Sequence, residues 1–212
     1  SLLLLQEHYS KLKSGSFLRS ATIKGLAIHT AEESGSNPGP DYQHGWGLLN
    51  VQKAANVISA SVASNNGSSS EHLMYENVLN TATPSFTTNV VSSGKTPLRV
   101  TICWTDVKGT VETTDVLNNT AKKLVNDLDI RLTSGSSTFL PYTLDPANAA
   151  SLAVPGDNLR DNVEQIVISN TLPGQTFTLT IKHKGTLKNS NQDFGLAVSG
   201  IGGTAYCAIT PS

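Results

Sequence analysis

The chain has 212 residues, of which 38% are hydrophobic and 15% charged, and its formal net charge at pH 7 is −1. This charge gives no electrostatic basis for binding nucleic acid or an anionic membrane, because both demand clustered positive charge. The longest apolar run, Leu2 to Leu5, is far shorter than the ~20 residues of a membrane-spanning helix. We therefore expect neither nucleic acid nor a membrane as a partner.

The same opening run lacks the basic start and the small-residue cleavage site of a signal peptide. Ser1 is therefore expected to be a cut within a longer chain rather than a natural mature start.

The stretch from Asp41 to Ile58 reads as a glycine-punctuated turn or strand that leads into a short capped helix. Gly45 and Gly47 flank Trp46, and glycine permits close packing or a positive φ without steric cost. Asn50 can cap the helix that follows. One apolar stripe with the i, i+3, i+4, i+7 spacing of a helix is formed by Val51, Ala54, Ala55 and Ile58.

The composition changes after this helix. The segment from Ser59 to His72, SASVASNNGSSSEH, is rich in Ser, Asn and Gly, which is typical of flexible connectors. We predict a linker here, and from Leu73 onwards the apolar period switches from helical to alternating.

Alternating apolar residues predict a series of strands separated by Asn and Gly clusters. In the clearest of them, LRVTICWTD, one face carries Leu98, Val100, Ile102 and Trp104. The other predicted strands span Leu73 to Leu79, Phe86 to Val91, Leu124 to Leu132, Thr138 to Tyr142, Val163 to Ile168, Phe177 to Ile181 and Phe194 to Val198. This number of strands suits an antiparallel sandwich that closes around its own core.

The run GWGLLNVQKAA resembles the last strand-turn-helix of the subtilisin-like serine protease domain, which typically reads G-x-G-x-[IVL]-[ND]-[AV]-x-x-A. Upstream, Ser1 to His8 resembles the back half of the helix that carries the catalytic serine in that family. LRSATIKGLAIHTA, Leu18 to Ala31, resembles the next helix and strand. The resemblance covers residues 1–58 and implies that they are the closing helices of an incomplete α/β catalytic domain.

The segments that carry this resemblance do not include the catalytic residues of the family. In that family the nucleophile lies in a Gly-Thr-Ser motif that would precede Ser1, and the aspartate and histidine lie further upstream. A serine becomes a useful nucleophile only with a neighbouring base, and the base needs an orienting acid. We expect no catalytic Ser/His/Asp triad in this chain and no hydrolysis by this polypeptide alone.

Four motifs of the strand-rich region carry a second resemblance. They are WTD (Trp104 to Asp106), LVNDLDI (Leu124 to Ile130), DNVEQIVI (Asp161 to Ile168), and HKG followed by QDFGLAVSG (His183 to Gly200). In this order they resemble the β-sandwich that follows the catalytic domain in some large bacterial subtilases, similar in architecture to the P domain of proprotein convertases. The expected fold is therefore mainly β with an α-helical N-terminal segment, its strands forming an antiparallel jelly-roll-like sandwich of about eight strands.

These resemblances divide the chain into four parts. They are the catalytic-domain helices at 1–58, a linker at 59–72, the accessory sandwich at 73–201 and a C-terminal linker at 202–212, in which Tyr206 to Ser212 leads towards a further module. Without the rest of the catalytic domain, the leucines at 2–5 need another apolar partner. We expect the helices to dock onto the sandwich, to associate with a second chain, or to be partly disordered.

One group of acidic residues could bind an ion. Asp127 and Asp129 lie two apart on an extended run and so project from one face. A nearby loop and strand start carry Asp157, Asp161, Asn162 and Glu164. Ca²⁺ takes 6–8 such oxygen ligands, so we predict a calcium site at Asp127, Asp129, Asp157 and Asp161. In the alternative, Asp127 and Asp129 end a strand or pair with lysines, and 157–162 is a polar turn.

Other candidate residues carry weaker signals. Cys103 and Cys207 form no disulfide framework, so we expect buried or free thiols, with a single bridge as the alternative. The five histidines have neither HExxH nor zinc-type spacing and are expected at the surface or in packing. Trp46 and Trp104 are expected to pack in the core rather than to stack on carbohydrate.

The sequence thus predicts a non-catalytic C-terminal fragment of a secreted, bacterial subtilisin-like serine endopeptidase. Its β-sandwich would support the folding, stability or substrate placement of the parent protease. Its partners would be the missing catalytic domain and the parent's protein or peptide substrates. The alternatives are an adhesion or carbohydrate-binding β-sandwich module and, third, a freestanding hydrolase with a site of its own.

Overall fold

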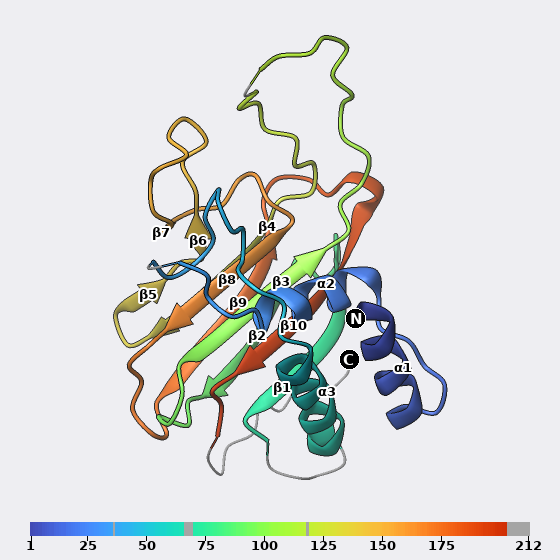
Figure 1. Ribbon diagram of the computed structural model, residues 1–212, viewed down its shortest axis with the longest axis vertical. Helices are drawn as coiled ribbons and strands as arrows, with labels where there is room; N and C mark the ends of the chain where they lie inside the picture. The colour runs from blue at the N-terminus through green and yellow to red at the C-terminus, as the bar shows by residue number, and fades with distance from the viewer. Residues whose placement is uncertain (36, 66–69, 118, 203–212) are drawn as a thin grey trace.

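The computed structural model describes residues 1–35, 37–65, 70–117 and 119–202 (Figure 1). This part of the chain is mainly β, with helices in its N-terminal region and antiparallel sheets after them. The α-helices are α1 (Leu2–Leu12), α2 (Ser20–His29) and α3 (Val51–Asn65), and a short 3₁₀ turn covers Lys188–Ser190. None of these helices is both long and apolar enough to cross a membrane.

The strands form two four-stranded sheets in which every pairing is antiparallel. The first sheet has the order β1 (His72–Asn80), β10 (Asn191–Ser199), β3 (Leu98–Trp104) and β8 (Val163–Ile168). The second has the order β2 (Ser85–Val91), β9 (Thr176–His183), β4 (Leu128–Ser134) and β5 (Ser137–Phe139). A separate short pair joins β6 (Tyr142–Thr143) to β7 (Val154–Pro155).

The main hydrophobic core lies between the two sheets. The alternation predicted on β3 is confirmed, because Leu98, Val100, Ile102 and Trp104 are fully buried in this core. The facing strands contribute Leu128, Ile130, Leu132, Phe177, Leu179 and Ile181. Each such side chain stabilises the fold by roughly 1.5–3 kcal/mol relative to exposure, so this core is the main source of stability for the sheets.

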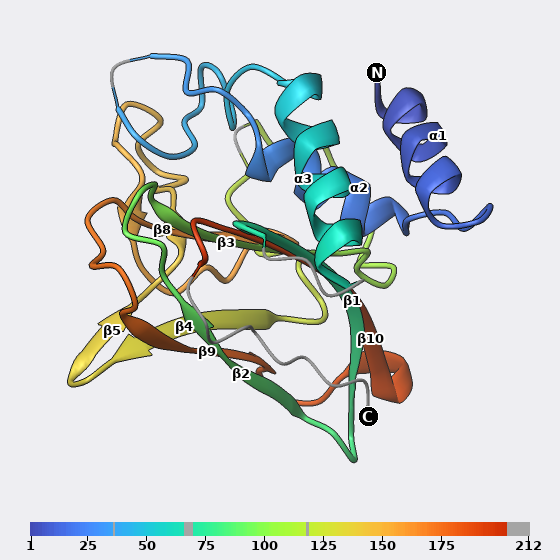
Figure 2. The ribbon, with the colours of Figure 1, turned by 90° about the horizontal axis from the view of Figure 1, so that it is seen from below.

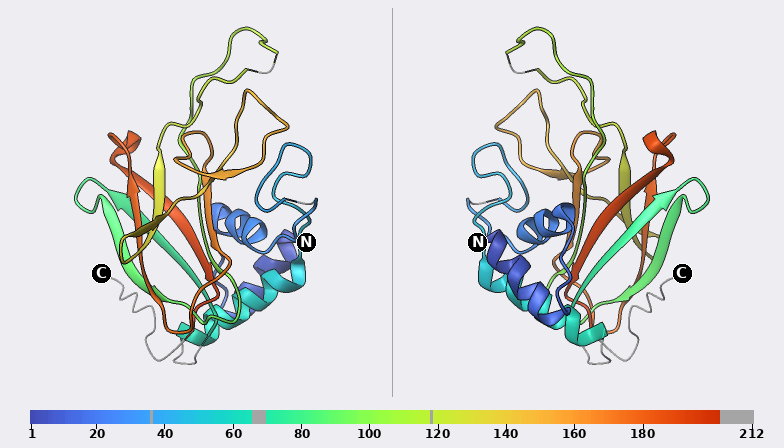
Figure 3. Two further views of the ribbon diagram at one scale, coloured as in Figure 1. Left: turned by 90° about the vertical axis from the view of Figure 1, so that its left-hand side faces the viewer. Right: turned by 90° about the vertical axis from the view of Figure 1, so that its right-hand side faces the viewer.

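The helices cover the outer face of the first sheet, so that Figure 2 shows three layers: helices, first sheet and second sheet. Figure 3 shows the helices outside one sheet only. Helix α2 lies directly on β3 and β10. Thr101 and Cys103, which the alternation places on the polar side of β3, are buried beneath it.

Two glycines allow this close approach of helix and sheet. A Cβ at Gly195 in β10 would lie 2.7 Å from the Cα of Thr22, and a Cβ at Gly25 in α2 would lie 3.0 Å from the Cβ of Cys103. Real Cβ atoms are essentially never found as close as 2.7 Å to another heavy atom. Larger residues at these positions would push α2 away from the sheet.

The other two helices pack against α2 and β1 around a second cluster. Helices α1 and α3 lie side by side (Figure 2), and their apolar faces meet α2 and Met74 of β1. The buried members are Leu5, Leu18, Ile23, Leu26, Ala54, Val57, Ile58 and Met74. Of the outcomes that we expected for the N-terminal helices, the structure therefore shows docking onto the sheet.

The glycine-punctuated turn has the predicted local geometry. Gly45 and Gly47 have φ values of 61° and 96°, and a Cβ at Gly47 would collide with the carbonyl oxygen of Glu32. The cap of α3 is also as predicted, since Asn50 Oδ1 accepts a hydrogen bond from Lys53 N at 2.8 Å. Trp46 packs against a small cluster that includes Cys103.

Some predicted boundaries are wrong. The expected linker begins too early, because α3 continues through residues 59–65. Ser61 explains the extension: its hydroxyl accepts a hydrogen bond from Met74 N at 2.7 Å, which fixes the last helical turns against β1. The predicted strand from Leu124 begins only at β4, because Asp106 accepts hydrogen bonds from the backbone N–H groups of Val125 and Asn126.

The predicted strand at 138–142 is divided into β5 and β6, and β7 was not predicted. Pro141, which has no N–H to donate to a ladder, separates the two pieces. Cys103 is free and buried, as expected. Cys207, the predicted segment Tyr206 to Ser212, and part of the predicted linker at 59–72 lie outside the described residues.

The helix–sheet contact yields a stability prediction. We expect Gly195→Ala to lower the free energy of unfolding by about 1–3 kcal/mol, the usual cost of overpacking a tight interior. Urea denaturation measures this. Gly109→Ala, in a half-exposed loop where the nearest atom to a new Cβ is the carbonyl oxygen of Lys123 at 3.0 Å, is the control expected to change stability less. An equal effect of both substitutions would contradict the importance of the contact.

Candidate functional site

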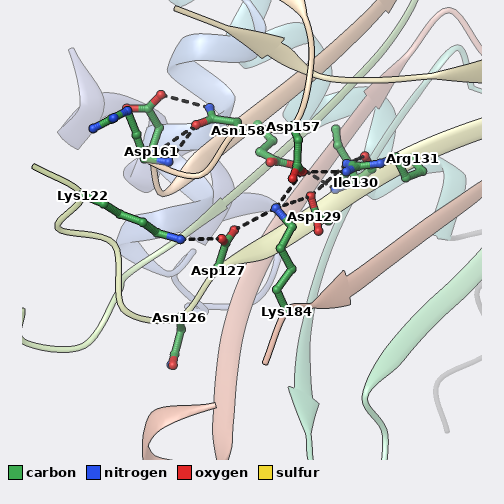
Figure 4. A network of polar contacts seen from close by, with 12 residues as sticks. Lys122, Asn126, Asp127, Asp129, Ile130, Arg131, Asp157, Asn158, Asp161 and Lys184 are labelled. Carbon is green, nitrogen blue, oxygen red and sulfur yellow. Dashed lines mark hydrogen bonds and ion pairs between the residues drawn. The ribbon is translucent and has the colours of Figure 1, made fainter. Parts of the chain in front are cut away.

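The structure brings three of the four predicted calcium ligands together at one end of the second sheet (Figure 4). Asp127 immediately precedes β4, Asp129 lies within β4, and Asp157 follows β7. The side chain of Asp129 is 1% exposed and that of Asp127 7%, whereas that of Asp157 is 49% exposed. The cluster therefore reaches from the protein interior to its surface.

Lys184 supplies the positive charge at the centre of these carboxylates. It follows β9 directly, and its Nζ lies 2.7 Å from Asp157 Oδ1, 3.1 Å from Asp129 Oδ1 and 3.5 Å from Asp127 Oδ1. The backbone fixes this position, because Lys184 N donates a hydrogen bond to the carbonyl oxygen of Asp127 at 2.8 Å. The lysine ammonium thus occupies the position that a bound cation would take.

Two further cations complete the charge balance. Arg131 Nη1 lies 2.9 Å from Asp129 Oδ1, and its Nη2 donates to Asp157 Oδ1 at 2.8 Å. On the other side, Lys122 Nζ donates to Asp127 Oδ2 at 2.9 Å. Three basic groups therefore face three aspartates, which is the alternative of pairing with lysines that the sequence left open.

Asp161 does not belong to this cluster. Its Oδ2 accepts a hydrogen bond from Asn158 Nδ2 at 3.0 Å. Asn158 Oδ1 in turn accepts from the backbone N–H groups of Arg160 and Asp161, at 3.0 and 3.2 Å. Hydrogen bonds from an asparagine side chain to the backbone two or three residues on are typical of a polar turn. Asn162 is also occupied, since its Nδ2 donates to the carbonyl oxygen of Trp104 at 2.8 Å.

The donor set therefore does not fit a resident calcium ion in this arrangement. Such an ion needs 6–8 oxygen ligands, and here an ammonium and a guanidinium group stand among the carboxylates. Within the described residues, no group of three or more His, Cys, Asp or Glu side chains is arranged to hold a metal. Calcium binding at these residues stays a prediction, and it would require Lys184 to leave.

Glu164 is a buried acid that contacts the same region from the other sheet. It is 0% exposed, and its Oε2 accepts a hydrogen bond from Ile130 N at 2.7 Å. No described residue offers a hydrogen bond to Oε1. Burial, aided by the negative charge of Asp129, raises the pKa of Glu164 to about 9. At neutral pH this side chain is therefore protonated and uncharged.

The pKa values of Asp129 and Asp157 shift in opposite directions because the two side chains differ in burial. Desolvation raises the pKa of Asp129, although Arg131 and Lys184 oppose the shift. Asp129 Oδ1 lies within ion-pair distance of both cations but is not aligned for a hydrogen bond with either. The hydrogen bond from Lys184 is the largest cause that lowers the pKa of Asp157 to about 2. Asp157 is therefore the firmly ionised partner of the lysine.

The sequence analysis left open a pairing of the aspartates with lysines, but it named neither Lys184 nor Arg131. Arg131 could have been suspected, because it lies two residues after Asp129 and so shares a face of β4. Lys184 is brought in by the pairing of β4 with β9, in which Leu128 stands opposite His183. A strand pairing between distant segments has no local signature.

A second polar constellation lies on the outer face of the first sheet. Ser199 Oγ, at the end of β10, is 2.7 Å from His29 Nε2 and 2.8 Å from His72 Nδ1. His29 Nδ1 is 2.9 Å from Thr101 Oγ1, which accepts a hydrogen bond from Gln165 Nε2 at 2.9 Å. These residues come from α2 and from all four strands of the sheet.

We assign the tautomers of these histidines so that every hydroxyl hydrogen of the chain of hydrogen bonds has an acceptor. Because Thr101 accepts from Gln165, its own hydroxyl hydrogen is satisfied by donating to His29 Nδ1. His29 Nε2 then carries the proton and donates to Ser199, whose hydroxyl donates to His72 Nδ1. In this arrangement His29 is not a base for Ser199. Among the described residues no acid hydrogen-bonds to His72 to orient it towards the serine, so these side chains do not form a catalytic triad.

No protein-family model matches the chain, and the comparison with curated proteins finds no match.

The buried acid predicts a specific pH dependence. The pKa of Glu164 rises from 4.5 to about 9 on folding, so its contribution to stability is complete below about pH 4.5 and is lost as the pH rises towards 9. We expect Glu164→Gln to gain stability relative to the natural protein between about pH 5 and 9, by at most ~1.4 kcal/mol per pH unit. Denaturant unfolding at several pH values measures this, with the exposed Glu7→Gln as a control. A constant difference across the range would show that Glu164 is not protonated in the fold.

Removing the central lysine tests its role as an internal cation. We expect Lys184→Met to destabilise the protein, with about 3–5 kcal/mol, the cost of breaking a fully buried pair, as the upper bound. Lys182→Met, at an exposed position of β9 two residues before Lys184, is the matched control. Added calcium should restore part of the melting temperature of Lys184→Met and leave the natural protein unchanged. An equal rise in both would mean that calcium binds without displacing the ammonium group.

Proposed function

We propose that this chain is the C-terminal part of a subtilisin-like serine endopeptidase and that it supports the parent enzyme without catalysing the reaction itself. The helices α1, α2 and α3 would close the catalytic domain, and the two sheets would form its accessory domain. The proposal rests on the motifs of residues 1–58 and 104–200 together with one observation about α1. Peptide-bond hydrolysis would be carried out by residues that this chain does not contain.

The observation that carries the proposal is the exposed apolar surface of α1. Leu3 is 81% exposed, Leu4 is 62% and Leu2 is 41%, while Leu5 of the same run is buried against α2 and α3. Leu12 and Phe17, at the end of α1 and just beyond it, are also exposed. A group of exposed apolar side chains on one segment is typical of a surface that packs against another protein body.

The position of α2 suggests how the accessory domain would help. This helix lies between the first sheet and the pair α1 and α3, so one side of the helical layer is fixed by the sheet. A sheet that holds these helices in place would stabilise the part of the catalytic domain to which they belong. We expect the loss of the sheets to reduce stability before it alters the chemistry.

We also infer that the two sheets form a jelly-roll-like sandwich. The strand orders β1-β10-β3-β8 and β2-β9-β4-β5 support this, because early and late strands alternate throughout the first sheet and across β2, β9 and β4 of the second. Two Greek keys folded together produce this kind of alternation. The antiparallel pairing throughout both sheets agrees with such a fold.

The alternative of a carbohydrate-binding module has less support. Among the described residues, the exposed aromatic side chains are Phe17 and Tyr42, and neither lies on a strand. Trp104 is fully buried and Trp46 is half-buried against the cluster beneath α2. A row of exposed aromatic rings, which would offer a stacking surface for sugars, is therefore not formed on the described strands.

The role proposed for the exposed leucines of α1 can be tested by comparing substitutions in this chain alone with the same substitutions in the parent protease. In this chain alone, Leu3→Ser and Leu4→Ser should change the free energy of unfolding by less than about 0.5 kcal/mol, as expected for exposed positions. In the parent protease each should cost roughly 1.5–3 kcal/mol, because the side chains would be buried there. Thermal and urea unfolding measure both.

Leu5→Ser is the matched control, and it should destabilise the protein in both contexts, because Leu5 is 1% exposed here. The parent is obtained by sequencing the coding region upstream of Ser1, where the proposal requires a Gly-Thr-Ser motif. An upstream region without that motif, or a parent in which Leu3 and Leu4 tolerate serine as they do here, would overturn the proposal. Hydrolysis of a fluorogenic peptide by this chain alone would favour the freestanding hydrolase instead.

A further inference from the structure

We propose that the chain of hydrogen bonds from His29 through Ser199 to His72 is an acid-sensitive contact. It holds the helical layer on the first sheet at neutral pH and releases α2 and α3 when either imidazole gains a proton. This inference goes beyond the proposed function, since it concerns the attachment of the helices whatever body they pack against.

Helix α2 is tied to the sheet at both ends. At its start, Glu76 of β1 accepts hydrogen bonds from Arg19 N at 2.8 Å and from the Thr22 hydroxyl. At its end, His29 bonds to Thr101 of β3 and Ser199 of β10, at 2.9 and 2.7 Å. Only the second tie runs through imidazoles, which change charge in the physiological pH range.

The surroundings of His29 disfavour a positive charge on its imidazole ring. His29 is 2% exposed, and both of its ring nitrogens are engaged by hydroxyl groups. Arg99 of β3 donates from Nη1 to the carbonyl oxygen of His29 at 2.7 Å. The C-terminus of a helix ordinarily favours a cation, but here the guanidinium group already fills that role. Burial first, and then Arg99 and His72, hold the pKa of His29 well below its usual range.

His72 is the point at which a proton can enter. His29, His72, Arg99 and Ser199 line a cavity of about 500 Å³ between the helices and the sheet edge. His72 is half-buried at the start of β1, so it is more accessible than His29. Burial lowers the pKa of His72, and the negative charge of Glu71 only partly opposes this.

The other charged groups around the cavity are already paired. Lys53 of α3 lies 2.8 Å from Glu32, Lys95 lies 3.7 Å from Glu71, and Glu33 accepts a hydrogen bond from Gly39 N at 3.0 Å. These carboxylates are therefore engaged when the histidines become charged. Protonation of His72 at Nδ1 also removes the acceptor for the Ser199 hydroxyl and reverses the direction of the chain.

The lowered pKa values of His29 and His72 determine how the stability of this contact depends on pH. A histidine whose pKa is lowered on folding stabilises the folded state fully above its unfolded pKa, near 6.5. This stability is lost as the pH falls below that value towards the lower pKa of the folded state. The histidines lie at the contact between helices and sheet, away from the main core, so the loss should be local to α2 and α3.

Hydrogen–deuterium exchange of the whole chain at about pH 7.5 and about pH 5.5 tests the proposal. After correction for intrinsic rates, we expect α2 and α3 to lose protection relative to β4 and β9. The loss should be up to about tenfold per pH unit for each imidazole that becomes charged. His72→Gln and His29→Gln should each reduce this response, and His44→Gln, at an exposed position, should leave it unchanged.

Three results would overturn the proposal. They are helices that keep their protection at the lower pH, helices that lose it in step with β4 and β9, and a response of His72→Gln identical to that of the natural protein. If His29→Gln does not fold, His72→Gln decides the matter alone. His72 is half-buried, and glutamine keeps a neutral polar side chain that can accept from Ser199 at this position.

Discussion

Helix α2 can lie directly on β3 and β10 only because small side chains meet at their contact, and the rest of the structure depends on this approach. Gly195 and Gly25 leave space for the Cα of Thr22 and the side chain of Cys103. Helices α1 and α3 then pack on α2 and β1 rather than on the sheet as a whole. A helix held farther out would separate the second apolar cluster from Met74 and would open the hydrogen bonds at both ends of α2.

The polar clusters around Asp129 and around His29 satisfy their buried polar groups in different ways. Around Asp129 the charges are kept, and Arg131 and Lys184 balance them at distances of 2.9 and 3.1 Å. Around His29 the hydrogen-bonded side chains are neutral, and each hydroxyl or imidazole group donates one hydrogen bond to the next. A buried charge without a partner is far more costly than a buried neutral group with one. The first cluster therefore depends on its ion pairs, whereas the second, in the proposed pH response, is stable only while its histidines stay neutral.

The helical layer has two faces with different roles. One face is fixed to the sheet by packing, by hydrogen bonds that Glu76 accepts and by those of His29, and the other presents the leucines of α1 to solvent. In the proposed parent protease, the layer would connect a catalytic body to an accessory domain. In that protease, a change in the attachment of α2 would be transmitted to the catalytic side through the same helices.

The sequence by itself determined most of the strands, the inward face of β3, the capped start of α3 and the proximity of Asp127 to Asp129. These features follow from periods of two and 3.6 residues and from a capping side chain, all of which act over a few neighbouring residues. Only the tertiary structure decided that α2 covers the polar side of β3, that α3 continues to Asn65, and that Lys184 stands among the aspartates. Each of these depends on segments that are distant in the chain, and small or polar residues such as Gly195, Thr101 and Ser199 look the same in sequence whether water or a helix lies above them.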